Sequence, residues 1–360
     1  MKLLYKLSLC LLIPIVSLSN NGDLDGKHTK QKTLKKEYTV TKNATLKIDN
    51  KYGNLDIVTW TGNTIAIEVK ITTNGNDLDE VQSRLDEIDV EFSGTSNYVS
   101  AETLIGKKKK SSWWNWSNNN DVNMKINYVV KMPITNHVDL SNDYGNITLG
   151  TLEGHAEISC DYGKITTKEL LADNNVINFD YTNNSYFEYI KSGKINADYS
   201  GFTVAKTKDL TIVADYTKSL IEIAENVNYN CDYGSLRVNK LNSISGNGDY
   251  LTVVLGDVYK NVTLNADYGS IKIGKMTKNA GDINIESDYV GIKIGIDPEY
   301  AFDFDIKLEY GSLTGEDDFE INTKSIKHSD KYYSGYHNKS NSGNLIKINS
   351  EYGSVTFDKK

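Results

Sequence analysis

The sequence predicts an all-β protein whose main part is a parallel β-solenoid with rungs of about 17 to 21 residues. Three observations predict it: tyrosine recurs at a nearly constant interval, an acidic residue precedes almost every such tyrosine, and aliphatic residues hold fixed positions on both sides. The recurring tyrosines are Tyr144, Tyr162, Tyr181, Tyr199, Tyr216, Tyr233, Tyr250, Tyr268, Tyr289 and Tyr310, and the same phrase returns at Tyr52 and Tyr352.

Each rung can be numbered from its tyrosine, taken as position 0. Because side chains along a strand point to opposite faces in turn, we expect the aliphatic residue at −4, the small residue at −2 and the tyrosine to face the core. The acidic residue at −1 then faces solvent. Glycine at +1 is expected to take the positive φ of a sharp corner, and an apolar pair at +3 and +5 opens a second strand. Typical triplets of this structural repeat are Asp143-Tyr144-Gly145, Asp161-Tyr162-Gly163, Asp232-Tyr233-Gly234 and Asp267-Tyr268-Gly269.

Units this short cannot fold alone, so we expect them to stack over residues 136–358 and to pair each strand with the rungs on either side. The alternative is a sandwich of antiparallel hairpins, in which the tyrosines would not keep one position relative to every corner. An insertion at 328–344, which carries Tyr332, Tyr333 and Tyr336, is expected to replace one rung.

Two cysteines of the mature chain, Cys160 and Cys231, both occupy position −2 and lie four rungs apart. This separation is roughly 19 Å at the usual strand spacing, whereas a disulfide needs Cα atoms within about 7 Å. We therefore expect two small buried thiols.

Residues 37–135 are expected to form a different β module, with strands near 38–40, 45–48, 55–60, 65–71 and 122–132. Between them, residues 77–92 place apolar side chains at helical spacing, and Asp77 followed by Glu80 is typical of a helix N-terminus. We expect this one amphipathic helix to act as a cap on an open end of the solenoid, because terminal rungs expose unpaired strands and apolar core.

A loop at 106–121 combines positive charge with aromatic side chains. It is a possible ligand-contact site for a sugar or a lipid surface. The alternative is a mobile insertion whose tryptophans pack back against the module. The residues concerned are Lys107, Lys108, Lys109, Lys110, Trp113, Trp114 and Trp116.

The first 19 residues have a basic start, an apolar run and a small-residue end, the pattern of a secretory signal peptide. A flexible polar linker is expected over 20–36. Lipidation at Cys10 is disfavoured because the bulky Leu9 precedes it. The apolar run is shorter than the roughly 20 residues of a spanning helix, so we expect an exported protein of the periplasm or cell surface that is not transmembrane.

Charge and residue types exclude several kinds of site. The net charge is −8, and loss of Lys2 and Lys6 with the signal leaves 38 basic against 48 acidic residues, a net charge of −10. Nucleic acid is therefore not an expected partner. The five histidines show no metal-ligand spacing, no phosphate-binding glycine loop is present, and we expect no cofactor.

The acidic residues at −1 should form a column with about 4.8 Å between neighbours. Repulsion along such a column must be offset, and we expect each carboxylate to accept hydrogen bonds from backbone N–H groups at the glycine corner. The alternative is Ca²⁺ bound between successive rungs. We otherwise expect no metal site.

The export signal, the leading β module with one helix, and units such as Asp143-Tyr144-Gly145-Asn146-Ile147 resemble the bacterial putative-adhesin β-solenoid family of the Bacteroidota envelope. The resemblance covers residues 37–358. It implies a fold and a location, with an adhesin-like domain of poorly defined role.

Two functions follow. The first is a non-catalytic envelope protein, adhesin-like or structural, whose partner is an unidentified envelope glycan, lipid surface or protein. The alternative is a carbohydrate-active β-helix enzyme, either a polysaccharide lyase or a hydrolase. Because the acidic residues repeat in every rung and Arg237 is the solenoid's only arginine, the sequence favours the first, and we expect no catalytic residue.

Overall fold

The computed structural model describes residues 25–106 and 122–360. It divides into two compact units, unit 1 up to Thr166 and unit 2 from Thr167 onward, each of which is described by itself. The export signal expected over 1–19, the start of the linker and the Lys/Trp loop with Lys107–Lys110, Trp113, Trp114 and Trp116 lie outside the described residues.

Unit 1 contains the helix α1 and most of the first eleven strands, and the division between the units falls inside β11. The elements are β1 (His28–Thr39), β2 (Thr45–Lys51), β3 (Leu55–Trp60), β4 (Thr64–Gly75), α1 (Leu78–Glu87), β5 (Ile88–Gly94), β6 (Tyr98–Ile105), β7 (Asn123–Pro133), β8 (His137–Asp143), β9 (Ile147–Leu149), β10 (Ala156–Asp161) and β11 (Ile165–Leu170).

Unit 2 contains strands only. They are β12 (Asn175–Asp180), β13 (Ser185–Asp198), β14 (Gly201–Asp215), β15 (Lys218–Asp232), β16 (Gly234–Asp249), β17 (Leu251–Val258), β18 (Val262–Met276), β19 (Ile283–Ile296), β20 (Phe302–Glu309), β21 (Leu313–Thr314), β22 (Glu320–Lys327), β23 (Asp330–His337), β24 (Leu345–Glu351) and β25 (Val355–Lys359).

The strands of unit 1 pair in two runs that share one apolar core. In the first run β2 lies parallel between β8 and β6, and β6 pairs antiparallel with β5. In the second run β3 lies parallel between β9 and β7, followed by β4 and β1 in antiparallel order. The β strands predicted for this module are present. The flexible linker predicted over 20–36 is wrong from His28 onward, because that segment pairs with β4 along its whole length.

The predicted helix is present but shorter than expected. Asp77 caps it, since the Asp77 carboxylate accepts hydrogen bonds from the backbone N–H groups of Asp79 and Glu80. The helix buries Val81 and Leu85 and ends at Glu87, whereas we predicted residue 92. The apolar residues beyond Glu87 alternate along strand β5, which pairs with β6, so tertiary pairing decides their conformation.

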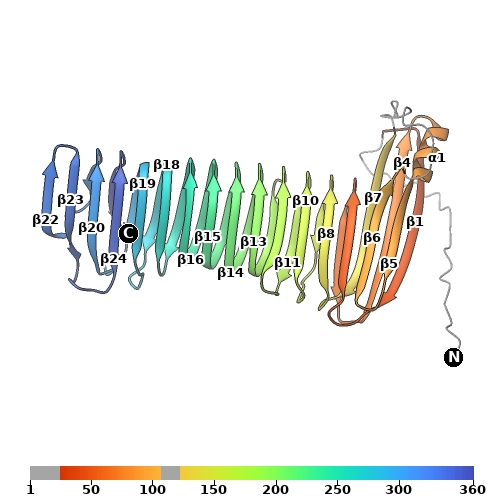
Figure 1. The fold of residues 1–360 in the computed structure, drawn as a ribbon, viewed down its shortest axis with the longest axis horizontal. Coiled ribbons are helices and arrows are strands. Elements are labelled where there is room, and N and C mark those ends of the chain that lie inside the picture. The colour runs from red at the N-terminus through yellow and green to blue at the C-terminus, as the bar shows by residue number, and fades with distance from the viewer. Residues whose placement is uncertain (1–24, 107–121) are drawn as a thin grey trace. The chain divides into compact units, whose positions relative to one another are not determined.

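Unit 2 is a stack of parallel strands, as the sequence predicts. From β12 to β19 consecutive strands pair in parallel, and β13 to β19 lie side by side in chain order (Figure 1). Equivalent positions align, so that Ile177 pairs with Ile195 and Ile195 with Ile212. In most rungs of unit 2, side chains at −4, −2, +3 and +5 form the buried core, whereas the rung of Tyr181 buries Ser185 and Phe187 at +4 and +6. From β12 to β19 this register rules out the antiparallel hairpins that were the alternative.

The last rung in the sequence is not the last rung in space. Strand β24 pairs in parallel with β19 on one side and with β20 on the other, and β25 lies between β19 and β21. The chain therefore leaves β19, builds β20 to β23, and returns to fill the gap beside β19 (Figure 1). The insertion predicted at 328–344 is wrong in part, because β23 pairs antiparallel with both β20 and β22 and extends the sheet.

Both cysteines of the described chain are free and buried, as the sequence predicts. Burial raises the pKa of each thiol to about 12, so both remain protonated at neutral pH. Within residues 25–106 and 122–360, no helix has the length and apolar character needed to cross a bilayer.

Candidate functional site: the stacked tyrosine edge

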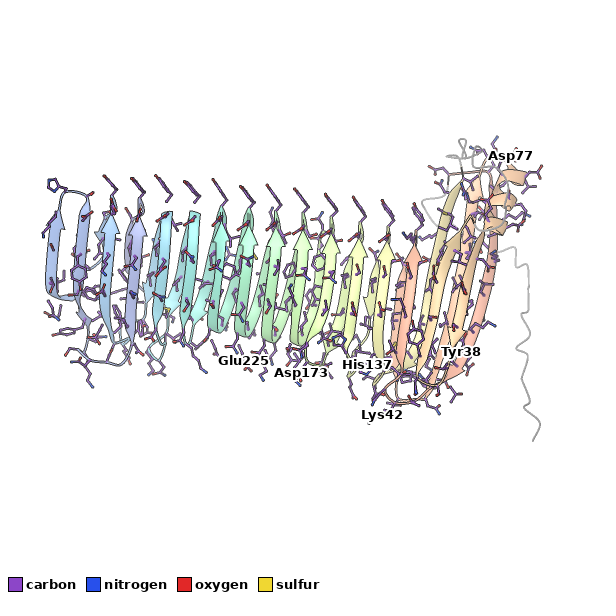
Figure 2. The ribbon with its side chains drawn as sticks, viewed as in Figure 1. Tyr38, Lys42, Asp77, His137, Asp173 and Glu225 are labelled. Carbon is purple, nitrogen blue, oxygen red and sulfur yellow. The ribbon has the colours of Figure 1, made fainter. Side chains whose placement is uncertain are left out.

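The recurring tyrosines point outward, so the prediction that they face the core is wrong. In unit 2 their exposed fractions lie between 46% and 60%, whereas the residues at −4 and −2 are buried as expected. The strand alternation ends at the acidic residue at −1, and the tyrosine begins the corner instead of continuing the strand. We call the row of tyrosines in each unit the tyrosine edge. Figure 2 shows such a row on the side of unit 2 opposite Asp173 and Glu225.

The backbone explains this orientation. Every recurring tyrosine has a positive φ, between 50° and 62°, in the left-handed region that costs an L-residue roughly 1–2 kcal/mol. A residue in this conformation turns its side chain out of the alternation set by the strand before it. Its N–H still takes part in the ladder, since Tyr233 N donates to Asp249 O at 3.0 Å and Tyr250 N donates to Asp267 O at 2.8 Å. The ladder bonds help to offset the cost of the corner.

Glycine at +1 has a different role from the one predicted. None of these glycines has a positive φ, because the tyrosine already supplies it. Instead, the glycine lets neighbouring rungs approach. A Cβ on Gly145 would lie 1.8 Å from the carbonyl oxygen of Gly53, and a Cβ on Gly353 would lie 2.2 Å from that of Val290. Rungs without glycine bury the +1 side chain, as at Leu251 and Val290.

The tyrosine rings stack face to face. In unit 2 the centroids of neighbouring rings are 4.6 to 5.3 Å apart and the ring planes differ by 2° to 8°. In unit 1, Tyr52 stacks on Tyr144 at 5.3 Å and Tyr144 on Tyr162 at 5.0 Å. The spatial order in unit 2 follows the returned rung and runs through Tyr181, Tyr199, Tyr216, Tyr233, Tyr250, Tyr268, Tyr289, Tyr352 and Tyr310.

The acidic residues at −1 form the column that the sequence predicts, but their carboxylates bond differently. Oδ1 of Asp198 accepts from the backbone N–H of Asp215 at 3.0 Å, and Oδ1 of Asp232 accepts from that of Asp249 at 2.8 Å. The donor is thus the acidic residue of the adjacent rung and not the glycine corner. Each such bond ties two rungs together and favours the charged carboxylate.

The column nevertheless concentrates negative charge. The pKa of Asp249 is raised above its ordinary 3.8, first by burial and then by the charges of Asp232 and Asp267. The pKa of Tyr233 is raised by burial, by the stacked tyrosines on both sides and by Asp232 and Asp249. The surroundings of Asp249 and Tyr233 therefore disfavour the ionised form of each group.

We expect salt to stabilise unit 2. Carboxylates about 4.8 Å apart repel by about 0.9 kcal/mol per pair even in water. Raising NaCl from about 0.05 M to 0.5 M shortens the Debye length, so salt screens this repulsion more strongly. The thermal midpoint should rise by about 3–8 °C. The control is Asp232→Asn with Asp249→Asn, which keeps both acceptors but removes two charges and should weaken the salt dependence. Equal salt dependence in the two proteins would contradict the repulsion.

Acidification should also stabilise the folded protein, but only over a limited range of pH. Because the folded pKa of Asp249 is raised, its protonation favours the folded state, and stability rises as the pH falls from 7 through that pKa. Asp358 has the opposite sign, since Lys293 lowers its pKa and its contribution is lost at pH values below the ordinary 3.8. As the pH falls from 7, a thermal midpoint that first rises and then falls below about pH 3.8 would agree with both pKa shifts. A midpoint that falls steadily from pH 7 would contradict the raised pKa of Asp249.

Among the residues that the structure describes, no group of three or more His, Cys, Asp or Glu side chains is arranged to hold a metal ion. Ca²⁺ binding between successive rungs remains an open prediction. A midpoint that is unchanged by millimolar Ca²⁺ and by chelator, at fixed ionic strength, would exclude it.

Within each unit, the structure brings the residues of the Asp-Tyr-Gly triplets beside those of the neighbouring rung. It also brings Tyr352 between Tyr289 and Tyr310, which the order of residues in the chain does not reveal. A signal for the outward tyrosines is present in the sequence. Apolar residues occur at +1, such as Leu251 and Val290, and at +3. Because side chains alternate between the two faces of a strand, these residues point inward and position 0 points outward.

No family model matches the chain, and no curated protein matches it. Solved structures that match include a putative cell adhesion protein from Clostridium sporogenes, with 12% identity, a TM-score of 0.19, and coverage of 92% of this chain and 100% of that one. A putative adhesin from Parabacteroides distasonis has 14% identity, a TM-score of 0.32, and coverage of 76% and 94%.

A putative lipid binding protein from Parabacteroides distasonis has 10% identity, a TM-score of 0.31, and coverage of 91% and 96%. The matches thus include putative adhesins, the group that the sequence resembles. Similarities of this size carry no argument about function, so the function proposed below rests on the chain's own residues.

Proposed function

We propose that this chain is an exported, non-catalytic envelope protein with an adhesin-like role, and that it binds its partner along the tyrosine edge. The observation that supports this function is a row of exposed aromatic residues in a strained backbone conformation. Glycine or asparagine fits a left-handed corner at lower cost than tyrosine. Tyrosine nevertheless occupies this corner in rung after rung, with about half of its surface in water. The corner conformation does not require tyrosine, which points to a function for the exposed side chains.

Stacking decides which part of each ring can meet a partner. Neighbouring rings cover each other's faces, so the exposed part is the ring edge with its hydroxyl group. From Tyr199 to Tyr352 in the spatial order, these hydroxyls make no hydrogen bond within the described chain. The edge therefore presents donors and acceptors at a regular spacing beside a row of carboxylates. An extended polymer whose polar groups repeat at a similar interval, such as an envelope glycan, fits this surface best.

The carboxylates support binding rather than catalysis. A glycosidase needs two carboxyl groups in unlike environments, one held protonated and one ionised. In the column, the same inter-rung hydrogen bond joins successive aspartates from Asp180 to Asp249. Such uniformity suits a repeating structural element.

The helix and the export signal complete the proposal. Val81 and Leu85 of α1 are buried in unit 1, which supports a capping role for the helix at the N-terminal module. Export rests on the pattern of residues 1–19, and it places the tyrosine edge in the periplasm or at the cell surface.

The test replaces Tyr216, Tyr233 and Tyr250 together by asparagine, which accepts the left-handed conformation. Binding to purified envelope polysaccharide should fall at least tenfold in co-sedimentation. The control replaces Tyr98, Tyr186 and Tyr259, which are exposed tyrosines outside the edge, and should bind as the unmodified chain does. Parallel assays with anionic vesicles and with envelope protein extract distinguish the other partner classes. Unchanged binding by the edge variant in all three assays would exclude the tyrosine edge.

A further inference from the structure

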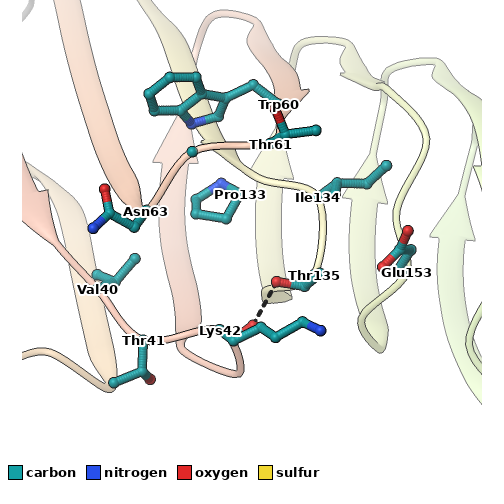
Figure 3. A pocket seen from close by; sticks show the side chains of 11 residues that line it. Val40, Thr41, Lys42, Trp60, Thr61, Asn63, Pro133, Ile134, Thr135 and Glu153 are labelled. Atoms are coloured by element: carbon teal, nitrogen blue, oxygen red, sulfur yellow. Dashed lines mark hydrogen bonds between the residues drawn. The ribbon is translucent and has the colours of Figure 1, made fainter.

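A pocket in unit 1 lies away from the tyrosine edge, where four turns meet. It has a volume of about 590 Å³ and is lined by the turns that follow β1, β3, β7 and β9 (Figure 3). This volume falls in the range of small-molecule sites. Its apolar surface comes from Val40, Trp60, Pro133 and Ile134.

Hydrogen bonds hold the turns in place. Asn136 is fully buried, and its Nδ2 donates to the backbone oxygens of both Thr41 and Lys42 at 2.9 Å. Thr135 Oγ1 donates to the Lys42 oxygen at 2.7 Å, and Ile134 N donates to the Trp60 oxygen at 2.8 Å. The walls are therefore formed before any ligand arrives, which lowers the entropy cost of binding.

The indole of Trp60 is also fixed. Its Nε1 donates to the Thr64 oxygen at 3.1 Å, and the Lys131 ammonium lies 4.1 Å from the ring centroid. Gly62 lies directly against the ring, since a Cβ there would come within 2.2 Å of it. The partly buried indole thus forms a rigid aromatic wall.

The polar groups around this wall are suited to hydroxyl groups. Asn63 and Glu153 lie on opposite sides of the pocket (Figure 3), and an amide or a carboxylate can bond two adjacent hydroxyls. Lys42 and Glu153 are both exposed, so water screens their charges and a zwitterionic or anionic ligand would gain little from them. A ligand with one apolar face and several neutral hydroxyls fits both the apolar and the polar walls.

We propose that this pocket binds a single sugar ring, a neutral pyranose, with its C–H face on the Trp60 side and its hydroxyls toward Asn63 and Glu153. The site is separate from the tyrosine edge and does not depend on the function proposed for that edge.

The test uses the full mature chain with Trp113, Trp114 and Trp116 replaced by phenylalanine, which leaves Trp60 as the only indole. Methyl glycosides of glucose, galactose, mannose and N-acetylglucosamine are titrated while the indole N–H resonance is followed by NMR. At least one should shift it with a dissociation constant on the order of 1 mM, as expected for a ligand of this size. The affinity should change less than twofold between about 0.05 M and 0.5 M NaCl.

Substitutions at two residues identify the polar contacts. Asn63→Ala and Glu153→Ala should each weaken binding at least fivefold, whereas Glu153→Gln, which keeps a hydrogen-bonding group, should stay within about twofold. Lys125→Met, an exposed change on β7 outside the pocket, is the matched control. No shift with any of the four glycosides would overturn the proposal, as would a loss of binding in Glu153→Gln equal to that in Glu153→Ala.

Discussion

Deleting residues 345–360 should unfold the C-terminal end of unit 2, whereas deleting the longer segment 297–360 should do less damage. The shorter deletion removes β24 from between β19 and β20 and β25 from between β19 and β21, which leaves unpaired strand edges and an open core. Burial of Ile346, Ile348, Val355 and Phe357 is lost. At roughly 1.5–3 kcal/mol each, this is about 6–12 kcal/mol, comparable with the stability of a domain.

The longer deletion also removes β20 to β23 on the far side of the gap and ends the stack at β19, so only one strand edge is opened. Hydrogen exchange measured by mass spectrometry separates the two variants. The shorter deletion should abolish protection in β20 and reduce it in β19, and the longer one should leave β13 to β18 protected as in the full chain. Protected β20 amides after the shorter deletion would show that β20 stays folded, either with β23 alone or by pairing directly with β19, contrary to this expectation.

Gly353→Ala should be strongly destabilising. The added Cβ would meet the Val290 carbonyl oxygen at 2.2 Å and Ser350 Oγ at 2.7 Å. The first contact is with backbone, so it can be relieved only by separating two rungs or by changing the corner. We expect a loss of about 3 kcal/mol, at the upper end for single substitutions.

Gly291→Ala is the matched control in the adjacent rung of the same unit. A Cβ on Gly291 meets nothing within 4 Å, and its φ is not positive. Its effect should stay within about 0.5 kcal/mol, with a small gain possible from a less flexible unfolded chain. Urea denaturation of both variants tests the difference. Equal midpoints would show that close approach of the rungs is not the reason for glycine at +1.

Much of the fold could be predicted because it depends on local periodicity. The buried residues at −4 and −2, such as Ile195 and Ala197, follow from the two-residue alternation of a strand, and the repeated spacing predicts parallel stacking. The N-cap at Asp77 could also be predicted, since it depends only on residues within one turn of helix. The separate free thiols followed from the same repeat.

The candidate site was less predictable, because either the glycine or the tyrosine could take the positive φ of the corner, and the two conformations place the tyrosine side chain differently. If glycine had taken the positive φ, alternation would have continued to the tyrosine and carried it into the core. In the structure the tyrosine takes it, and Tyr233 and its equivalents face water. The pocket at Trp60 could not be foreseen either, because its four turns are distant in sequence and meet only when β1, β3, β7 and β9 are in place.

The sequence by itself determined the repeat, the acidic column and the aliphatic and small residues of the core, since each depends on the side-chain order within one rung. Only the tertiary structure decided which strand lies next to which at the C-terminal end. Ile348 pairs with Ile285 on one side and with Ile306 on the other, so the final rung enters between two earlier ones. All rungs carry nearly the same pattern and could pair with one another. The antiparallel β22–β23 hairpin pairs with β20 on its outer side, which leaves the position beside β19 for the end of the chain.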